Sequence, residues 1–164
     1  MLAADLDAIF AGWFGRQSIF DDSIWNCLEL KRMSIHPPLF ATAAMLGLVG
    51  VLAGTFGAHG LKGRITTELL ETFEIGVRYN LVHAAALLAV ATLAADTSRR
   101  IVRVAGWLFV AGIVVFSGTL YALAITGAKW LGMITPFGGV CFILGWASLA
   151  WFARSLPQPL LDSK

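Results

Sequence analysis

Two histidines are the residues in this sequence with the strongest potential for chemistry. His59 directly follows an apolar run of twenty residues, and His83 lies near the start of a later apolar run. Ionisable side chains at membrane depth are costly and usually face a bundle interior or a cavity. Two neutral imidazoles facing each other there could hold a metal, ligate haem or relay protons to a quinone. They could equally donate to backbone carbonyls or to each other and serve packing alone, which is the interpretation that the sequence favours.

Three further polar residues are candidates for the same site. Tyr79 and Asn80 lie one turn before His83, and Tyr121 belongs to a later apolar run at a similar expected depth. A cluster of tyrosine and histidine at an outer-leaflet pocket would be a ligand site, whereas hydrogen bonds between helices would make Asn80 a packing residue worth about 0.6 to 2 kcal/mol per bond. The candidate ligand-binding set is His59, His83, Tyr121, Tyr79 and Asn80. No CxxCH or HExxH motif accompanies it, so the sequence predicts no metal site and no cofactor.

The elements that must position these residues are four apolar helices. With 58% hydrophobic and 13% charged residues, the 164-residue chain is far from the composition of a water-soluble protein. Its first apolar run has no charge over twenty residues, about 30 Å of helix, which matches the hydrocarbon core of a bilayer. We therefore expect an all-α integral membrane bundle of four transmembrane helices with short, antiparallel connections. The expected spans are 39–58, 79–95, 104–126 and 130–152.

A short interfacial helix is expected before the second span. Phe73, Val77 and Leu81 fall on one helical face, and Glu74 and Arg78 stand at the spacing that favours an ion pair within a helix. We expect this segment to lie along the membrane surface and to turn inward near residue 79.

Small residues and a proline predict how the spans pack. The first span carries a stripe of glycines at intervals of three and four residues, which lets a neighbouring backbone approach closely. The fourth span has a proline followed by two glycines, a pattern that fits either a kinked, ion-coordinating helix or a helix start with tight packing. The expected packing residues are Gly47, Gly50, Gly54, Gly57, Pro136, Gly138 and Gly139.

The rest of the chain predicts its organisation and orientation. Residues 1–32 are expected to be an accessory extension, with Met33 as an alternative natural start, followed by a membrane domain at 33–155 and a tail at 156–164. More Lys and Arg lie on the side of both termini, which predicts cytoplasmic termini. The net charge of +2 gives no reason to expect a nucleic-acid partner. Two separated cysteines support neither a disulfide framework nor a zinc site.

Four sequence blocks resemble one known family. They are GTFGAHGLK at 54–62, YNLVHAAALL at 79–88, FSGTLYALAITG at 116–127 and ITPFGGVCFILGW at 134–146. In this order they closely resemble the small bacterial membrane proteins of the domain-of-unknown-function 423 family, which is related to the eukaryotic transmembrane protein 256. The resemblance implies a four-helix integral protein, in bacteria of the inner membrane, with no established activity, substrate or cofactor.

The function expected from these residues is structural. The glycine stripe, the minimal loops and the position of all ten Asp and Glu outside the spans or at their edges favour a non-enzymatic accessory component of the membrane or of a membrane complex. Such a protein would contact the lipid bilayer and pack against another membrane protein or itself. Two alternatives stay open, namely a quinone-, haem- or lipid-binding component of a membrane enzyme that uses the histidines and Tyr121, and a transporter of protons or small solutes.

Overall fold

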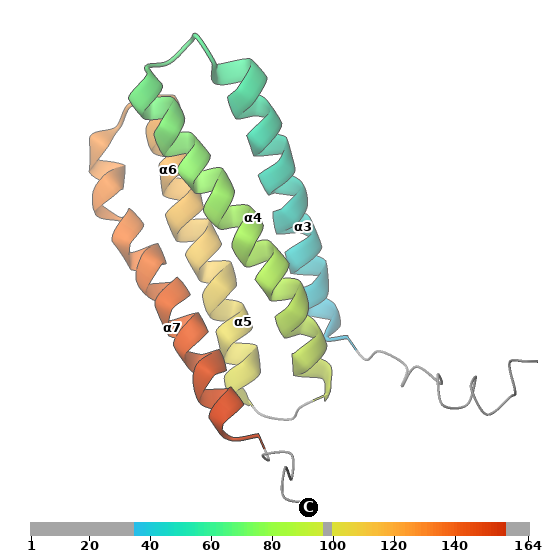
Figure 1. The fold of residues 1–164 in the computed structure, drawn as a ribbon. Coiled ribbons are helices and arrows are strands. Elements are labelled where there is room, and N and C mark those ends of the chain that lie inside the picture. Colours follow the sequence, from blue (N-terminus) through green and yellow to red (C-terminus); the bar gives the residue numbers. More distant parts are fainter. Residues whose placement is uncertain (1–34, 97–99, 157–164) are drawn as a thin grey trace, which may run out of the picture. The chain divides into compact units, whose positions relative to one another are not determined.

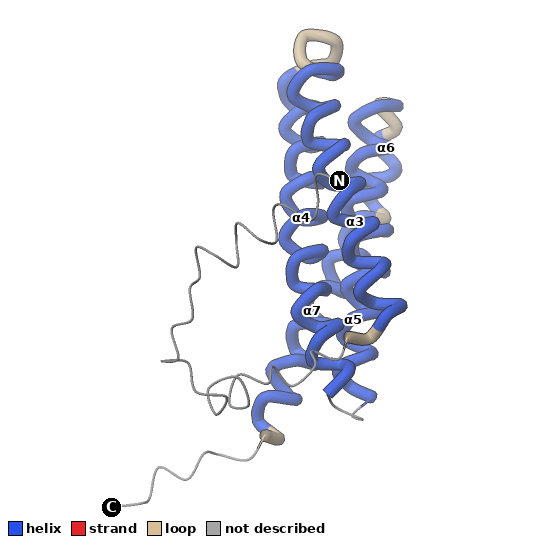
Figure 2. The backbone as a smooth tube through the Cα atoms, turned by 90° about the vertical axis from the view of Figure 1, so that its right-hand side faces the viewer, coloured by secondary structure: helices blue, strands red, loops and turns tan. Residues whose placement is uncertain are grey.

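The computed structural model describes residues 35–96 and 100–156, which belong to the second of two units, Ser34–Lys164. The predictions made for residues 1–32, and for nearly all of the tail at 156–164, lie outside the described residues. The described part is mostly helical, with short loops, and contains no strand, as predicted (Figure 2). Its elements are α3 (Pro37–Thr55), the π-helical turn η1 (Phe56–Leu61), α4 (Thr67–Asp96), α5 (Arg100–Gly112), the π-helical turn η2 (Ile113–Ser117), α6 (Gly118–Thr126), the 3₁₀ helix η3 (Lys129–Met133) and α7 (Thr135–Arg154).

Four of these helical stretches are long and apolar enough to cross a membrane. They cover Pro37–Leu61, Thr67–Ala95, Arg100–Thr126 and Lys129–Arg154, which are 25, 29, 27 and 26 residues long. At 1.5 Å per residue each measures roughly 38 to 44 Å, more than the hydrocarbon core alone, so each can tilt or extend into the headgroup layer. The predicted bundle of four transmembrane helices is confirmed, with every span longer than its apolar core suggested.

The separate interfacial helix before the second span is a prediction that the structure corrects. Residues 67–96 form one continuous helix, α4, in which Thr66 accepts a 3.4 Å hydrogen bond from the backbone N–H of Leu69 near the start. The helix continues without a break past residue 79, where the inward turn was expected. Nearby, a Cβ on Gly76 would come within 2.9 Å of the Tyr121 ring, so this glycine permits close packing between α4 and α6. The charged segment is therefore the end of the second span nearest the 62–66 loop.

The helix ends follow local chemistry. Pro37 and Pro38 begin α3, and Pro136 lies in the first turn of α7, where a missing N–H costs least. Pro136 thus lies at the start of α7, directly after η3, which is the position that the helix-start interpretation predicted. Gly127 ends α6 with a φ of 71°, a left-handed conformation that glycine adopts without strain.

The four long helices stand side by side, with α3 and α7 on opposite edges (Figure 1). α3 packs on α4, α4 packs on α5, η2 and α6, and α7 packs on α5 and η2. Two groups of buried apolar residues form the core. One spreads over α3, α4, α5 and α7 around Leu39, Leu87 and Phe109, and a smaller one near the 62–66 loop contains Leu61, Phe73, Val77 and Ala124.

Glycines form two close helix contacts. On α3 and η1, a Cβ added to Gly50, Gly54 or Gly57 would meet the α4 side chains of Leu81, Val77 and Phe73 at 2.7, 3.3 and 3.1 Å, while one added to Gly47 would meet nothing within 4 Å. On the other edge, a Cβ on Gly138 of α7 would lie 2.8 Å from the backbone Cα of Phe116, whereas one on Gly139 would stay 3.9 Å from the Phe116 ring. Of the predicted packing glycines, Gly47 and Gly139 therefore make no tight contact.

Candidate functional site between α4 and α7

His83 is the buried polar centre of the candidate site. It lies on α4 with 6% of its surface exposed. Its Nδ1 is 2.8 Å from the carbonyl oxygen of Tyr79, one turn earlier, and its Nε2 is 3.3 Å from the indole Nε1 of Trp146 on α7. A carbonyl can only accept and an indole N–H can only donate, so Nδ1 carries the proton and Nε2 accepts. The imidazole is neutral, and both of its nitrogens have partners from its own chain.

Aromatic rings surround this histidine. The ring of Phe142 stacks on the imidazole at a centroid distance of 3.6 Å, Phe109 meets its edge at 5.5 Å, and Tyr79 lies roughly parallel at 5.8 Å. Trp146 also lies against Phe109 at 5.0 Å. Each aromatic pair of this kind contributes about 0.5 to 1.5 kcal/mol beyond area burial. We call these five residues, His83, Tyr79, Phe109, Phe142 and Trp146, the aromatic cluster.

The aromatic cluster connects two helices whose backbones are not in close contact. The main backbone contacts of α7 are to α5, η2 and η3, and those of α4 are to α3, α5, η2, α6 and η1. Large side chains from α4 and α7 fill the space between them and supply the hydrogen bond from Trp146 to His83. Gly112 and Gly145 make room for it, because a Cβ on either would come within 2.6 Å of the rings of Phe142 and Phe109 respectively. The cluster therefore fixes α7 against the centre of the bundle.

A second polar contact lies beside the first. Asn80 is buried on α4 and donates from Nδ2 to the hydroxyl of Tyr121 on α6 at 3.2 Å, which is the hydrogen bond between helices that its sequence context allowed. The Tyr121 ring packs on Phe73 at a centroid distance of 4.8 Å. Two buried atoms, the Asn80 Oδ1 and the Ser117 Oγ, have no hydrogen-bond partner among the described residues. Ser117 stands one turn before Tyr121, so both of these oxygen atoms lie near the contact between α4 and α6.

His59 lies away from both contacts. It belongs to η1 and is exposed, whereas His83 is buried in the middle of α4. Gly54 of α3 and Gly57 of η1 lie opposite Val77 and Phe73 of α4. His59 therefore stands about twelve residues, or roughly 18 Å, from His83 along α4, toward the 62–66 loop. The structure brings together Tyr79 with His83 and Asn80 with Tyr121, and it does not form the pair of facing histidines. No group of three metal-ligating side chains is found within residues 35–96 and 100–156.

The sequence did not single out the partners of His83. Trp146, Phe109 and Phe142 come from two other helices, and the hydrogen-bonded pair is 63 residues apart in the chain. One signal was available, since Trp146 lies inside an apolar span and not at its end, where tryptophan usually sits. An indole N–H at membrane depth needs an acceptor because no water is present there, and histidine was one of few acceptors in the spans.

Comparisons with known proteins give a family but no activity. The family described as "Protein of unknown function (DUF423)" matches residues 53–139, just over half of the chain. The UPF0382 membrane protein YwdK of Bacillus subtilis (strain 168) is 49% identical over 104 residues, which cover 63% of this chain and 85% of the relative. The UPF0382 membrane protein SAB0533 of Staphylococcus aureus (strain bovine RF122 / ET3-1) is 46% identical over 106 residues, covering 65% and 86%. No solved structure matches the chain.

Proposed function

Because this chain belongs to the DUF423 family of proteins of unknown function, whose relatives are named membrane proteins, we propose that it is a non-enzymatic accessory component of a membrane complex. The observation that carries the proposal is the state of His83. Both ring nitrogens are engaged by Tyr79 and Trp146, so the most chemically capable buried group acts in packing. A metal or haem iron would have to displace one of these partners before it could bind.

The outer helices supply the surface for a partner. α3 and α7 lie at the edges of the bundle and expose large apolar side chains along most of their length. Such faces suit lipid, a second membrane protein or another copy of this chain, since all three present apolar surface at this depth. We propose that one of the two edges packs against such a protein in the native membrane.

The orientation is part of the proposal. We place the protein in the bacterial inner membrane with both termini in the cytoplasm, because eight Lys and Arg lie on the side of the termini and four on the side of residues 62–64. A Lys62→Cys variant, with Cys27 and Cys141 replaced by serine, should react with a membrane-impermeant maleimide added to intact spheroplasts. Labelling only after lysis would reverse the orientation.

The accessory role can be tested by native mass spectrometry. The protein, carried in its own lipid by a styrene–maleic acid copolymer, should appear in a defined assembly with a second membrane subunit or with itself, and without a prosthetic group. A haem, quinone or metal mass that is present in the wild type and lost in His83→Phe would overturn the proposal. A bare monomer in the same lipid particles would contradict the packing role.

One observation favours a second candidate. Tyr79 and His83 line a small apolar pocket of about 130 Å³ on the outside of the bundle, together with Arg78 and Val82. A quinone ring could stack there, which would make the protein a quinone-binding component of a membrane enzyme. Quenching of Trp146 fluorescence by a titrated quinone, and its loss in Tyr79→Ala, would support this candidate over the accessory role.

A further inference from the structure

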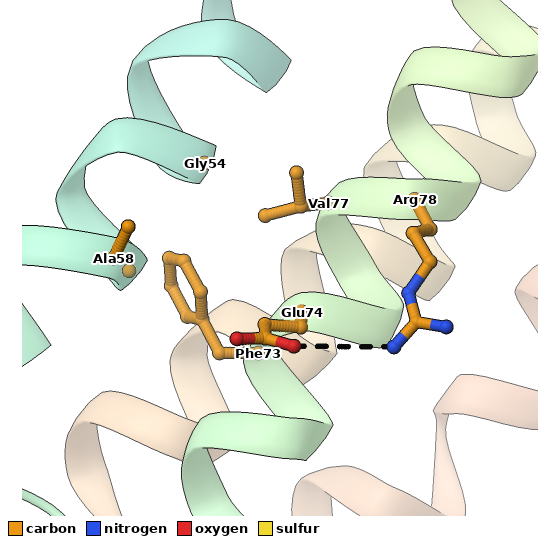
Figure 3. Close-up of a pocket in the computed structure, with 7 residues that line it drawn as sticks. Gly54, Ala58, Phe73, Glu74, Val77 and Arg78 are labelled. Atoms are coloured by element: carbon orange, nitrogen blue, oxygen red, sulfur yellow. Dashed lines mark ion pairs between the residues drawn. The ribbon is translucent and has the colours of Figure 1, made fainter. Parts of the chain in front are cut away.

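A pocket opens between the end of α3 and the outer end of α4. It measures about 220 Å³ and is lined by Gly54, Gly57, Ala58, Phe73, Glu74, Val77 and Arg78. Figure 3 shows Phe73 and Val77 on the inner side of this space, with Glu74 and Arg78 joined by an ion pair at its edge. We call it the rim pocket. Its wall includes Gly57 and Ala58 of the π-helical turn η1, a type of turn that is frequent at functional sites.

Arg78 also lines the apolar pocket of Tyr79, Val82 and His83 described above. The two pockets flank it at different depths. The residues of α4 in the rim pocket run from Phe73 to Arg78, and those in the apolar pocket run from Arg78 to His83, one to two turns farther from the 62–66 loop. Arg78 is thus shared by both pockets, and along α4 their lining changes from charged residues up to Arg78 to uncharged residues after it.

Arg78 marks the boundary between headgroup and hydrocarbon on α4. Charged residues recur from the start of the helix to Arg78, and none follows between Tyr79 and Ala95. The ion pair of Arg78 with Glu74 is loose, with 3.9 Å between Nη2 and Oε2, and the two side chains are 72% and 52% exposed. An exposed pair at this distance contributes little to stability, so both charges are available to another partner of suitable sign.

We propose that the rim pocket and the apolar pocket together hold one glycerophospholipid with an ammonium headgroup. The guanidinium of Arg78 takes the phosphate, for which its planar fork is well suited, and the carboxylate of Glu74 takes the ammonium group. One acyl chain runs past Tyr79 and Val82 in the apolar pocket. The adjacent opposite charges match the opposite charges of a zwitterionic headgroup. They disfavour an anionic headgroup such as that of phosphatidylglycerol, because it has no ammonium group to offset the negative charge of Glu74 beside its phosphate.

This inference does not rest on the proposed accessory function, since the lipid site uses Arg78 and Glu74 and leaves the hydrogen bonds of His83 intact. The test is native mass spectrometry of delipidated protein titrated with phosphatidylethanolamine, phosphatidylglycerol and diacylglycerol of the same acyl chains. We expect phosphatidylethanolamine to be retained most and diacylglycerol least. Equal retention of all three lipids, or retention of phosphatidylglycerol at or above that of phosphatidylethanolamine, would overturn the site.

Substitutions assign the two charges. Arg78→Gln should lower retention of phosphatidylethanolamine about fivefold, the effect of one basic residue near a lipid headgroup. Glu74→Gln should remove the preference for phosphatidylethanolamine over phosphatidylglycerol. The matched control is Arg103→Gln, which changes an arginine of α5 at the opposite end of the bundle and should leave retention unchanged. Retention in Arg78→Gln equal to that of the wild type, with both variants melting as the wild type does, would contradict the assignment.

Discussion

The two outer helices are attached to the centre of the bundle in different ways. α3 lies on α4 through glycines whose added Cβ would meet the side chains of Leu81, Val77 and Phe73. α7 lies on α5 and η2 through glycines whose added Cβ would meet aromatic rings and, at Gly138, the backbone of Phe116. A side-chain end can rotate away and a backbone cannot. The regular glycine stripe on α3 therefore marks the more tolerant contact, and the irregular glycines of the α7 contact mark the stricter one.

Hydrogen bonding also differs between the contact of α7 with the bundle and the contact of α3 with α4. At the α7 edge, Trp146 bonds His83 and the hydroxyl of Thr119 lies 2.9 Å from that of Thr135. No side-chain hydrogen bond between α3 and α4 is found within the part of the chain that the structure describes. A hydrogen bond between two helices requires one relative position of the helices, and no water can replace it at membrane depth. It therefore restricts how the helices pack more strictly than apolar contact does. We expect α7 to have one position and α3 to tolerate small shifts.

The largest effect is expected at Gly138. In Gly138→Ala the new methyl group would clash with the backbone of Phe116, so α7 must move and take Phe142 and Trp146 with it. We expect a loss of about 3 kcal/mol or more in the free energy of unfolding. Thermal unfolding in one detergent, followed by size-exclusion fluorescence, measures it. The neighbouring Gly139→Ala is the control and should be neutral or slightly stabilising; equal melting temperatures for the two variants would refute the strict contact.

A somewhat smaller effect is expected at His83. In His83→Ala the indole N–H of Trp146 loses its acceptor and a cavity opens beside Phe142, which together should cost about 2 to 3 kcal/mol. His59→Ala, at an exposed position, should change the unfolding free energy by less than about 0.5 kcal/mol. The same unfolding assay compares them. If both histidine variants behaved alike, the two residues would share a role, against the separation that the structure shows.

The smallest effect is expected at the contact between α3 and α4, and it tests how well this contact accommodates an added methyl group. Gly50→Ala would place a Cβ 2.7 Å from the Cδ2 of Leu81, which can rotate, so we expect a cost of about 1 kcal/mol. Gly47→Ala meets nothing within 4 Å and should stabilise α3 by up to about 1 kcal/mol through helix propensity. A loss at Gly50 as large as that at Gly138 would erase the difference between the two edges.

Much of this fold follows from the sequence because it depends on local composition. The four apolar runs are spans, the prolines begin helices, and the spacing of Glu74 and Arg78 produces their ion pair. The predicted spans were too short because the charged ends of the helices continue past the apolar run, as the first turns of α4 do. Helical periodicity alone does not distinguish such an end from an interfacial helix.

The site was less predictable because it depends on contacts between distant segments. The role of Asn80 followed from its burial cost, whereas the partner of His83 had to come from another helix whose rotation and depth no local pattern specifies. The π-helical turns η1 and η2 have no sequence signal of their own. Their position could not be predicted, although η2 ends at Ser117, one turn before Tyr121 of the site. Which glycines touch backbone likewise depends on the register between α5 and α7, so Gly138 and Gly139 look equivalent in the sequence.

The most direct test of the account is the protonation of His83 in a bilayer. This histidine serves packing with both nitrogens engaged, and nitrogen-15 spectra of histidine-labelled protein report each nitrogen separately. Variants His36→Gln and His59→Gln assign the three histidines of the chain. We predict a protonated Nδ1 and an unprotonated Nε2 whose signal shifts in Trp146→Phe and stays unchanged when zinc, haem or a quinone is added. A protonated Nε2, or an Nε2 signal that moves with one of these additions, would contradict the account.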